Sequence, residues 1–473
     1  LILETGFKLL PYLVESFLAA MATMPRQLKV KTLEGGVLTL EVMPANTIEQ
    51  LKAMLREKKH CEDFIEGQIL KVKVLLDGLL VDDDGQTLES AGLLQAESEV
   101  TVMYHRNEVE AATKEAIHAE GLLQVNIPSS LTEIPTGAFQ DCNQVLTVAI
   151  PDSVTAIGER AFHKCSSLVS VAIPQSVTAI GESAFDGCIC LASIAIPESV
   201  TAIGERAFYK CNSLVSIAIP QSVTAIGESV FALCPSLKTI TIPESMPAIA
   251  DNAFSKCSSL ASIAIPESVV RIGDYAFASC KSLASIAIPQ SVTFIGVGAF
   301  SSSKVASITI PPSVTRIRVN TFHGCRSLKS ITIPGSVTAI EHQAFDSCTS
   351  LASIMIPNSV RDIGISAFAG CSRLASITIP ESVTAISDRA FIDCKSLASI
   401  TISQYVTAIG GQAFEGCESL ARVTIPESVT TIGDRAFQQC GSLESITIPE
   451  SLRDYDRLAF AFDDTSKLQV KRH

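Results

Sequence analysis

Tryptophan is absent from this sequence, and aromatic residues make up only 5% of its 473 residues. Because 47% of the residues are nevertheless hydrophobic, the interior has to be built mainly from aliphatic side chains that are used repeatedly in one structural role. An excess of basic charge is absent too, since 36 lysines and arginines stand against 49 aspartates and glutamates, a formal net charge of −13. Such a chain has no positive field to attract phosphate backbones, so we do not expect nucleic acid as a partner.

The motifs of catalytic sites are missing as well. The seven histidines are scattered, none stands in an H-E-x-x-H motif, and neither G-x-x-x-x-G-K-[ST] nor G-x-S-x-G occurs. An acidic row follows several prolines, but glutamines interrupt it, so a solvated edge is a better interpretation than a calcium site; the row contains Glu198, Glu244, Glu267, Glu381 and Glu427. We therefore predict a protein that is not an enzyme and has no catalytic residue, cofactor or metal site.

The front of the chain lacks an uninterrupted apolar run. Glu4, Lys8, Pro11 and Glu15 break up residues 1–23, so a membrane span is not expected there. A secretory signal would need a basic start and a clean apolar middle, and this segment has neither. We expect residues 1–23 to form a disordered or helical N-terminal segment.

A 23-residue repeat is the dominant feature of the remaining chain. The stretch SVTAIGERAFHKCSSLVSVAIP (Ser153 to Pro174) recurs with small changes, and each unit begins with proline in all but one case. The interval is 23 residues throughout except for one of 22 residues, between Pro289 and Pro311. A fixed period in this range is typical of a solenoid, in which each unit buries its apolar side against its neighbours.

Each unit of the solenoid, here called a coil, divides into three pieces. The L-x-S-I-x-I piece alternates apolar and small polar residues, which predicts a strand in a parallel sheet with strands about 4.8 Å apart. The V-T-x-I-G piece predicts a second short extended segment on the opposite wall. The x-x-A-F-x-x-C piece predicts a short helical turn that sends phenylalanine and cysteine inward.

Thirteen cysteines share one position of the coil. They are open to interpretation as a disulfide ladder or as metal ligands, but no histidine accompanies them in a zinc-binding order. Side chains that run parallel in a packed stack also seldom point at each other. We therefore expect small buried thiols that fill a corner of each coil, and thiols left reduced favour a cytoplasmic location.

The motifs L-x-x-I-x-I-P and I-G-x-x-A-F-x-x-C in 23-residue units resemble the leucine-rich repeats of the BspA-like class. The resemblance implies an α/β fold, a leucine-rich-repeat solenoid with a parallel β-sheet. It also implies an alternative function, because BspA-like repeats resemble those of surface and adhesion proteins.

The front domain has no repeat phase. QLKVKTLEGGVLTLEV predicts two strands around a Gly35-Gly36 hairpin, ANTIEQLKAMLREKK predicts a helix, and VKVLLDGLLV and SEVTVMYHR predict further strands. This ββαββ order resembles the ubiquitin-like β-grasp. The resemblance places an exposed apolar patch on Leu33, Leu75 and Met103, but no terminal Gly-Gly follows, so the domain would be recognised in place and not conjugated.

These observations predict the domains and the function. The expected divisions are an N-terminal segment, a ubiquitin-like domain, a linker or capping helix, the leucine-rich repeats and a C-terminal cap, over residues 1–23, 24–106, 107–121, 122–450 and 451–473. We expect a non-enzymatic scaffold for other proteins, with the ubiquitin-like domain docking to ubiquitin receptors or proteasome-linked proteins. The alternatives are a cell-surface adhesion protein and a structural subunit of a larger assembly.

Within the repeats, the residues that vary most lie on the G-x-x-A-F-x-x-C side. A partner-binding surface is therefore expected there before the sheet, at His163-Lys164, Tyr209-Lys210, Asp274-Tyr275, Arg316 with Arg318, and Arg361-Asp362.

Overall fold

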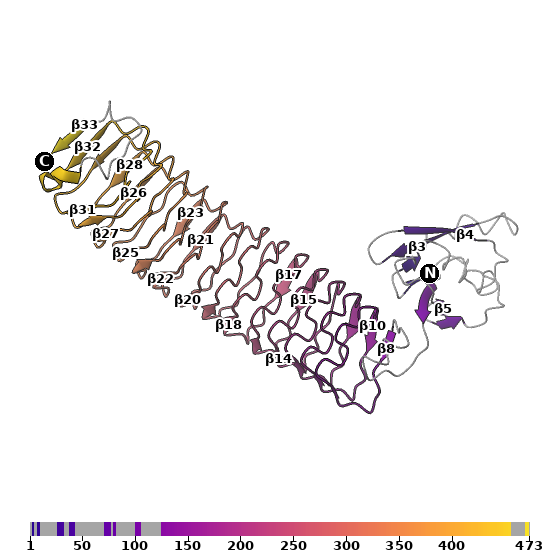
Figure 1. The fold of residues 1–473 in the computed structure, drawn as a ribbon. Coiled ribbons are helices and arrows are strands. Elements are labelled where there is room, and N and C mark those ends of the chain that lie inside the picture. Colours follow the sequence, from indigo (N-terminus) through magenta and orange to yellow (C-terminus); the bar gives the residue numbers. More distant parts are fainter. Residues whose placement is uncertain are drawn as a thin grey trace. The chain divides into compact units, whose positions relative to one another are not determined.

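A computed structural model describes residues 2–3, 7–9, 26–32, 37–42, 71–76, 79–81, 100–105, 124–455 and 469–472. It divides into a front unit, residues 1–127 with 144–149, and a repeat unit, residues 128–143 with 150–473. The two units are described separately below, and Figure 1 labels many of the elements.

The front unit contains a seven-stranded sheet in the order β4-β3-β2-β1-β7-β5-β6. Its strands are β1 (Ile2–Leu3), β2 (Phe7–Leu9), β3 (Arg26–Thr32), β4 (Val37–Val42), β5 (Lys71–Leu76), β6 (Leu79–Val81) and β7 (Val100–His105). Strands β3 and β4 pair antiparallel from Arg26↔Val42 to Lys31↔Val37, which confirms the hairpin predicted around the two glycines.

The leading segment departs from its prediction. Where described, residues 1–23 form strands and no helix: β2 pairs antiparallel with β3, and β1 pairs parallel with β7. Two strands therefore lie between β3 and β7 that the expected ββαββ order does not contain, and the ubiquitin-like fold is not established. The expected helix at residues 45–59 and the linker at 107–121 lie outside the described residues.

In most coils the first strand pairs in parallel with the equivalent strand of a neighbouring coil, as predicted, and these strands form five separate sheets. Pairing is in register at a shift of 23 residues, as in Ser216↔Thr239 and Ile217↔Ile240. In most of these strands the middle residue is buried and its two neighbours are exposed. The strands are β8 (Gln124–Asn126), β10 (Thr147–Ala149), β12 (Ser170–Ala172), β15 (Ser216–Ala218), β17 (Thr239–Thr241), β21 (Ser307–Thr309), β23 (Ser330–Thr332), β26 (Ser376–Thr378), β28 (Ser399–Thr401), β30 (Arg422–Thr424) and β32 (Ser445–Ile448).

The V-T-x-I-G piece forms the second extended segment of each coil, again as predicted. These two-residue strands pair in parallel, as in Ala202↔Ala225 and Ile203↔Ile226, and together they are called the short-strand wall. Its strands are β9 (Glu133–Ile134), β11 (Ala156–Ile157), β13 (Ala179–Ile180), β14 (Ala202–Ile203), β16 (Ala225–Ile226), β18 (Ala248–Ile249), β19 (Arg271–Ile272), β20 (Phe294–Ile295), β22 (Arg316–Ile317), β24 (Ala339–Ile340), β25 (Asp362–Ile363), β27 (Ala385–Ile386), β29 (Ala408–Ile409) and β31 (Thr431–Ile432).

The predicted helical turn is wrong, because the x-x-A-F-x-x-C piece is a run of tight turns. In one coil the N–H groups of Ala184, Asp186 and Cys188 each bond the carbonyl three residues earlier. The alternate N–H groups instead donate to the next coil, as from Phe185 to Ala207 at 2.8 Å. A helix would need all of these donors within its own segment, so stacking replaces the helix by a third ladder of inter-coil bonds.

Two residues of each turn run have a left-handed backbone. In the same coil these are Ser183 (φ 52°) and Gly187 (φ 77°), and the equivalent positions of the other coils also have positive φ. Residues other than glycine adopt this conformation at a cost, which the inter-coil hydrogen bonds offset. Among the described residues, the only helix is the 3₁₀ segment η3 (Glu450–Tyr455), so the helical part of the α/β prediction is not borne out there.

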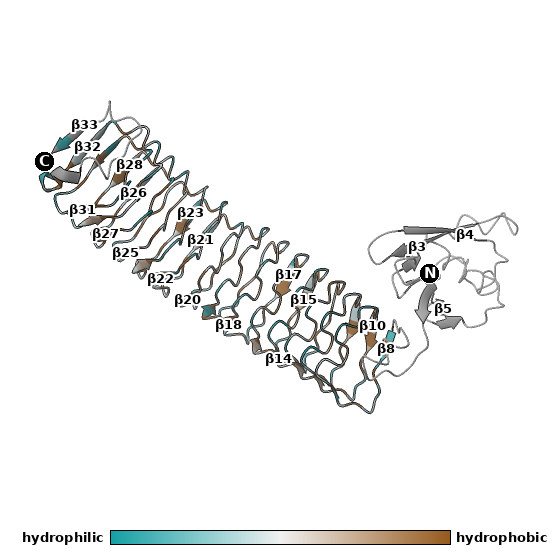
Figure 2. Cartoon of the chain, in the orientation of Figure 1, coloured by the Kyte–Doolittle hydropathy of each residue, from teal (hydrophilic) through white to brown (hydrophobic). Residues whose placement is uncertain are grey.

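The interior consists of rows of identical side chains. Fourteen phenylalanine rings, from Phe139 to Phe437, stack with centroids 5.2–5.8 Å apart and planes within 14° of each other. Figure 2 shows the resulting alternation of hydrophobic and hydrophilic segments along each coil. At the C-terminal end, β33 (Gln469–Arg472) pairs in parallel with β32. No helix in the described part of the chain is long and apolar enough to span a membrane.

Glycine follows the short strand in most coils and keeps the short-strand wall continuous. Its N–H donates to the preceding coil, as from Gly227 to the Ile203 carbonyl at 2.9 Å. A Cβ at Gly227 would lie 2.2 Å from the Glu205 nitrogen, so there is no room for a side chain without a shift of the coil.

The short-strand wall is interrupted three times, and each interruption coincides with a residue that replaces this glycine. The breaks precede β18, β22 and β27, whose coils carry Ala250, Arg318 and Ser387 at the glycine position. None of these three donates the backbone bond within residues 124–455; the Ser387 hydroxyl bonds the carbonyl instead. Glu341 is an exception, because its N–H keeps the bond at 2.8 Å.

Candidate interaction surfaces

The three residues of the expected apolar patch are only partly described. Leu33 lies outside the described residues, whereas Leu75 is in β5 and Met103 is in β7. These two strands pair antiparallel, and Met103 is opposite Lys73, two residues before Leu75. Neighbouring strands thus carry two of the three residues, and their role in binding stays a prediction.

The outer face of the long strands is plain, as the repeat predicts. Small residues, namely serine, threonine and alanine, occupy its exposed positions in most coils, for example Ser170 and Ala172 of β12 and Ser376 and Thr378 of β26. Two large side chains stand out on it: Met355 is 84% exposed, and the side chain of Arg422 is 80% exposed. A face with so few aromatic or arginine anchors is a poor candidate for selective protein binding.

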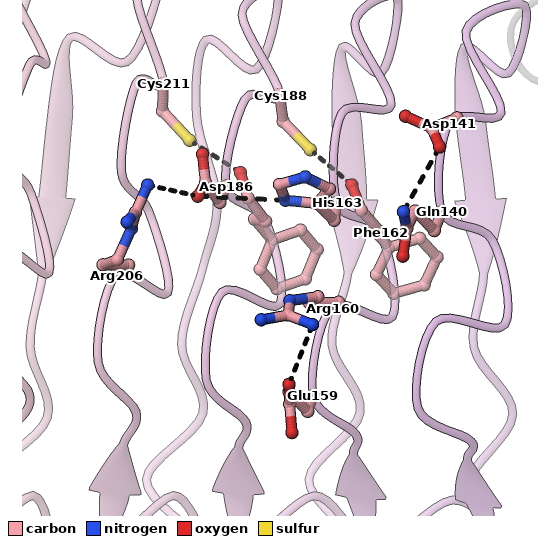
Figure 3. Close-up of polar contacts among 11 residues, drawn as sticks. Gln140, Asp141, Glu159, Arg160, Phe162, His163, Asp186, Cys188, Arg206 and Cys211 are labelled. Carbon is pink, nitrogen blue, oxygen red and sulfur yellow. Dashed lines mark hydrogen bonds and ion pairs between the residues drawn. The ribbon is translucent and has the colours of Figure 1, made fainter.

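The turn side brings together a charged cluster that sequence reasoning found only in part. His163, Asp186 and Tyr209 occupy the same position in three successive coils, and Arg206 lies in the third of these coils. Figure 3 shows Asp186 between His163 and Arg206. Arg206 Nη2 is 3.2 Å and His163 Nδ1 is 3.8 Å from Asp186 Oδ2. Asp186 was missed, although its spacing of 23 residues from His163 would have shown that the two are neighbours.

Burial governs the electrostatics of this cluster. It lowers the pKa of His163, while the nearby Asp186 carboxylate acts in the opposite direction and Lys164 lowers the pKa further. The imidazole is therefore mostly neutral at pH 7. The Arg206 guanidinium and the Lys210 ammonium lie over the Tyr209 ring, 4.2 and 5.2 Å from its centroid.

A second imidazole–carboxylate pair occupies the equivalent position in two later coils. His323 Nδ1 is 3.4 Å from Asp346 Oδ2. Among the residues with described side chains, no group of three or more His, Cys, Asp or Glu is arranged to hold a metal ion. The ion pairs hold the side chains of these clusters in fixed positions.

A third cluster lies on the short-strand wall. Phe294 is flanked by Arg271 from the coil before and Arg318 from the coil after, with guanidinium carbons 4.2 and 4.3 Å from the ring centroid. Arg271 pairs with Asp251 at 3.0 Å, and Arg316 pairs with Glu341 at 3.2 Å. Arg316 and Arg318 were singled out from the sequence. Arg271 and Phe294 were not, although both replace the usual alanine of their row.

The row of cysteines is buried, as predicted, and none of the fourteen cysteines within residues 124–452 forms a disulfide. In twelve of them the thiol donates a hydrogen bond of 3.0–3.3 Å to the phenylalanine carbonyl of the preceding coil, as from Cys257 to Phe231. Burial raises the pKa of Cys257 to about 12 and that of Cys325 to about 11. Protonated, buried thiols resist oxidants in any compartment, so they do not indicate where the protein resides.

We expect these thiols to be unreactive in the folded protein. Fifteen cysteines are present in the chain; Cys190 is exposed and Cys61 lies outside the described residues. At pH 8, a thiolate-specific reagent such as Ellman's reagent should modify at most these two rapidly, because the others are buried and their thiols stay protonated at that pH. Titration in guanidinium chloride should then reveal all fifteen. Rapid modification of more than two before unfolding would contradict the buried row.

Comparison with known proteins agrees with this architecture. Residues 112–238, 224–352 and 338–469 match the profile of the BspA type leucine-rich repeat region. A leucine-rich repeat protein from Bacteroides ovatus is 33% identical, covers 74% of this chain and 92% of its own, and superposes with a TM-score of 0.61. No curated protein matches the chain significantly.

Two other solved structures are similar at lower TM-scores. A leucine rich cell surface protein from Faecalibacterium prausnitzii is 33% identical over 68% of this chain and 87% of its own, with a TM-score of 0.45. A leucine-rich repeat protein from Eubacterium ventriosum is 24% identical over 62% and 88%, with a TM-score of 0.44. Because the family profile covers residues 112–469 and the Bacteroides structure shares the stack of coils, the chain belongs to the BspA-type leucine-rich repeat family.

Proposed function

We propose that this protein is a non-enzymatic scaffold for protein–protein interaction. The observation that carries the proposal is that buried residues stabilise the coils, whereas the outer residues of some coils form charged and aromatic clusters. The buried phenylalanine, cysteine and isoleucine rows and the backbone ladders hold the frame, while the clusters around Asp186 and Phe294 place arginine and aromatic side chains on the outside. Arginine and aromatic residues are the side chains that dominate binding energy at protein interfaces.

The front domain is proposed as a docking module within this scaffold. Its resemblance to the ubiquitin-like family, and the adjacent strands that carry Leu75 and Met103, support a role for the patch of Leu33, Leu75 and Met103. The proposed partners are ubiquitin receptors or proteasome-linked proteins, which recognise such patches without conjugation.

Replacing Leu75 by alanine is expected to remove a distinct subset of partners, because the substitution truncates one apolar side chain of the patch. The full-length tagged chain, its Leu75→Ala variant and a Thr378→Ala control would be purified from the source cell, and co-purifying proteins quantified by mass spectrometry. Thr378 is exposed on the plain strand face, so this control should recover the same partners as the unaltered chain. Equal recovery by all three proteins would refute docking through Leu75; the absence of any protein above background would refute the scaffold.

The two candidate functions predict different cellular locations. Docking to ubiquitin receptors places the protein in the cytoplasm, whereas an adhesion role, the alternative suggested by the family, places it at the cell surface. Surface biotinylation of intact cells, followed by detection with an antibody to the repeats, separates the two. A structural subunit would instead be found only within a larger complex on native mass analysis.

A further inference from the structure

We propose that Phe294 and Arg318 form a docking site for an acidic, extended segment of a partner protein. The inference rests on the scaffold function proposed above, and it names the site and the chemistry of its partner. Four features of the short-strand wall support the inference: its composition, the stacking of its side chains, its charge, and the interrupted hydrogen bonding between its strands.

Composition singles out three consecutive coils. Alanine is the first residue of most short strands, namely β11, β13, β14, β16, β18, β24, β27 and β29. Strands β19, β20 and β22 instead begin with Arg271, Phe294 and Arg316. Glu133, Asp362 and Thr431 also replace the alanine, but only here does the row of short strands carry an aromatic ring between arginines. Val270, beside Arg271, is 46% exposed.

Stacking orders the guanidinium groups before any partner arrives. Arg271 and Arg318 reach the Phe294 ring from the coils on its two sides, at 4.2 and 4.3 Å from the centroid. A guanidinium packed on an aromatic face keeps its N–H donors at the rim of the ring, in a planar fork that matches a carboxylate. Less side-chain entropy is then lost on binding.

Charge distinguishes Arg318 from its neighbours. Arg271 is paired with Asp251 and Arg316 with Glu341, whereas the Arg318 side chain has neither an ion pair nor a hydrogen-bond acceptor among residues 124–455. A single carboxylate would supply both. The carboxylates of Asp251 and Glu341 would repel a long polyphosphate or an anionic membrane, which favours a peptide that offers one or two acidic side chains and an apolar one for Val270.

At Arg318 a backbone hydrogen bond between coils is missing. Arg318 stands where most coils have glycine, and its N–H does not bond the Ile295 carbonyl. The pairing of short strands is interrupted between β20 and β22. Departures from a local rule that the rest of a molecule obeys are expected at functional sites. Gly296, in the coil before, keeps its bond to Ile272 at 2.9 Å, so the interruption begins at the coil that carries the arginine.

Arg318→Gly is the decisive variant, because it should weaken binding strongly without impairing the fold. A phage library of random dodecapeptides would be selected on the full-length chain, and the affinity of the most enriched peptides measured by fluorescence anisotropy. We expect the enriched peptides to contain aspartate or glutamate beside an apolar residue. Affinity should fall at least tenfold for Arg318→Gly and for Phe294→Ala, while the thermal midpoint of Arg318→Gly stays unchanged or rises. Arg389→Gln, which alters an exposed arginine that bonds Gln412, should bind like the unaltered chain.

Each other outcome overturns the proposal. Enriched peptides that bind Arg318→Gly as well as the unaltered chain would leave the scaffold function intact and refute this site. Enrichment of peptides without acidic residues, or of none, would refute the acidic partner. Tighter binding of the unaltered chain to phosphatidylserine vesicles or to single-stranded DNA than to any peptide would assign the arginine to phosphate recognition instead. A concentration-dependent dimer lost in Arg318→Gly, with no peptide bound, would make a second copy the occupant.

Discussion

Phe254→Ala is expected to destabilise the solenoid by about 3–5 kcal/mol, the cost of removing a fully buried aromatic side chain. The Phe254 ring is completely buried between Phe231 and Phe277, at centroid distances of 5.8 and 5.5 Å. Its loss leaves a cavity that two neighbouring coils share, because each coil is part of the core of the next. Urea denaturation followed by circular dichroism would measure the change in free energy of unfolding.

Phe139→Ala provides the matched comparison. Among the described residues, Phe139 stacks on one ring, Phe162, at 5.3 Å. Its replacement should cost less by about 1 kcal/mol, the scale of one aromatic pair. Hydrogen exchange should show faster amide exchange in the coils on both sides of Phe254, and on one side of Phe139. Equal losses at the two sites would contradict stabilisation by nearest-neighbour coils.

Gly227→Ala is expected to cost roughly 2–4 kcal/mol, combining overpacking with the loss of a backbone hydrogen bond. The new Cβ would lie 2.2 Å from the nitrogen and 2.4 Å from the Cα of Glu205. The coil has to move, and the bond from the Gly227 N–H to Ile203 should break. Strand β16 would then separate from β14, as β18 is separated from β16 at Ala250.

Gly335→Ala is the control, because no atom lies within 4 Å of a Cβ at that position. It should be neutral, or stabilising by about 0.4–1 kcal/mol through the unfolded state. Ala250→Gly tests the reverse, and should slow amide exchange at residue 250 by allowing a bond to the Ile226 carbonyl. If Gly227→Ala proved as harmless as Gly335→Ala, crowding between coils would not be the reason for the glycine row.

The charged clusters show which side-chain contacts the 23-residue period predicts and which it does not. His163 and Asp186 are one repeat apart, as are His323 and Asp346 in a later pair of coils, so their proximity follows from the period alone. The Phe294 cluster was harder to foresee, because Arg318 meets the ring from a different position of its coil than Arg271 does. Side-chain reach, and not register, decides that contact.

The period of the sequence by itself determined the stack of coils, the two extended walls, and the inward rows of phenylalanine and cysteine. That was possible because every coil has the same neighbours, so one pattern of buried positions serves the whole repeat. Only the tertiary structure decided that tight turns replace the expected helical turn, since Phe185 and its equivalents donate their N–H groups to another coil. It likewise decided where the short-strand wall breaks and that Ile2–Leu3 and Phe7–Leu9 join the front sheet. Those features depend on backbone contacts between segments distant in the chain, which no local pattern of apolar residues encodes.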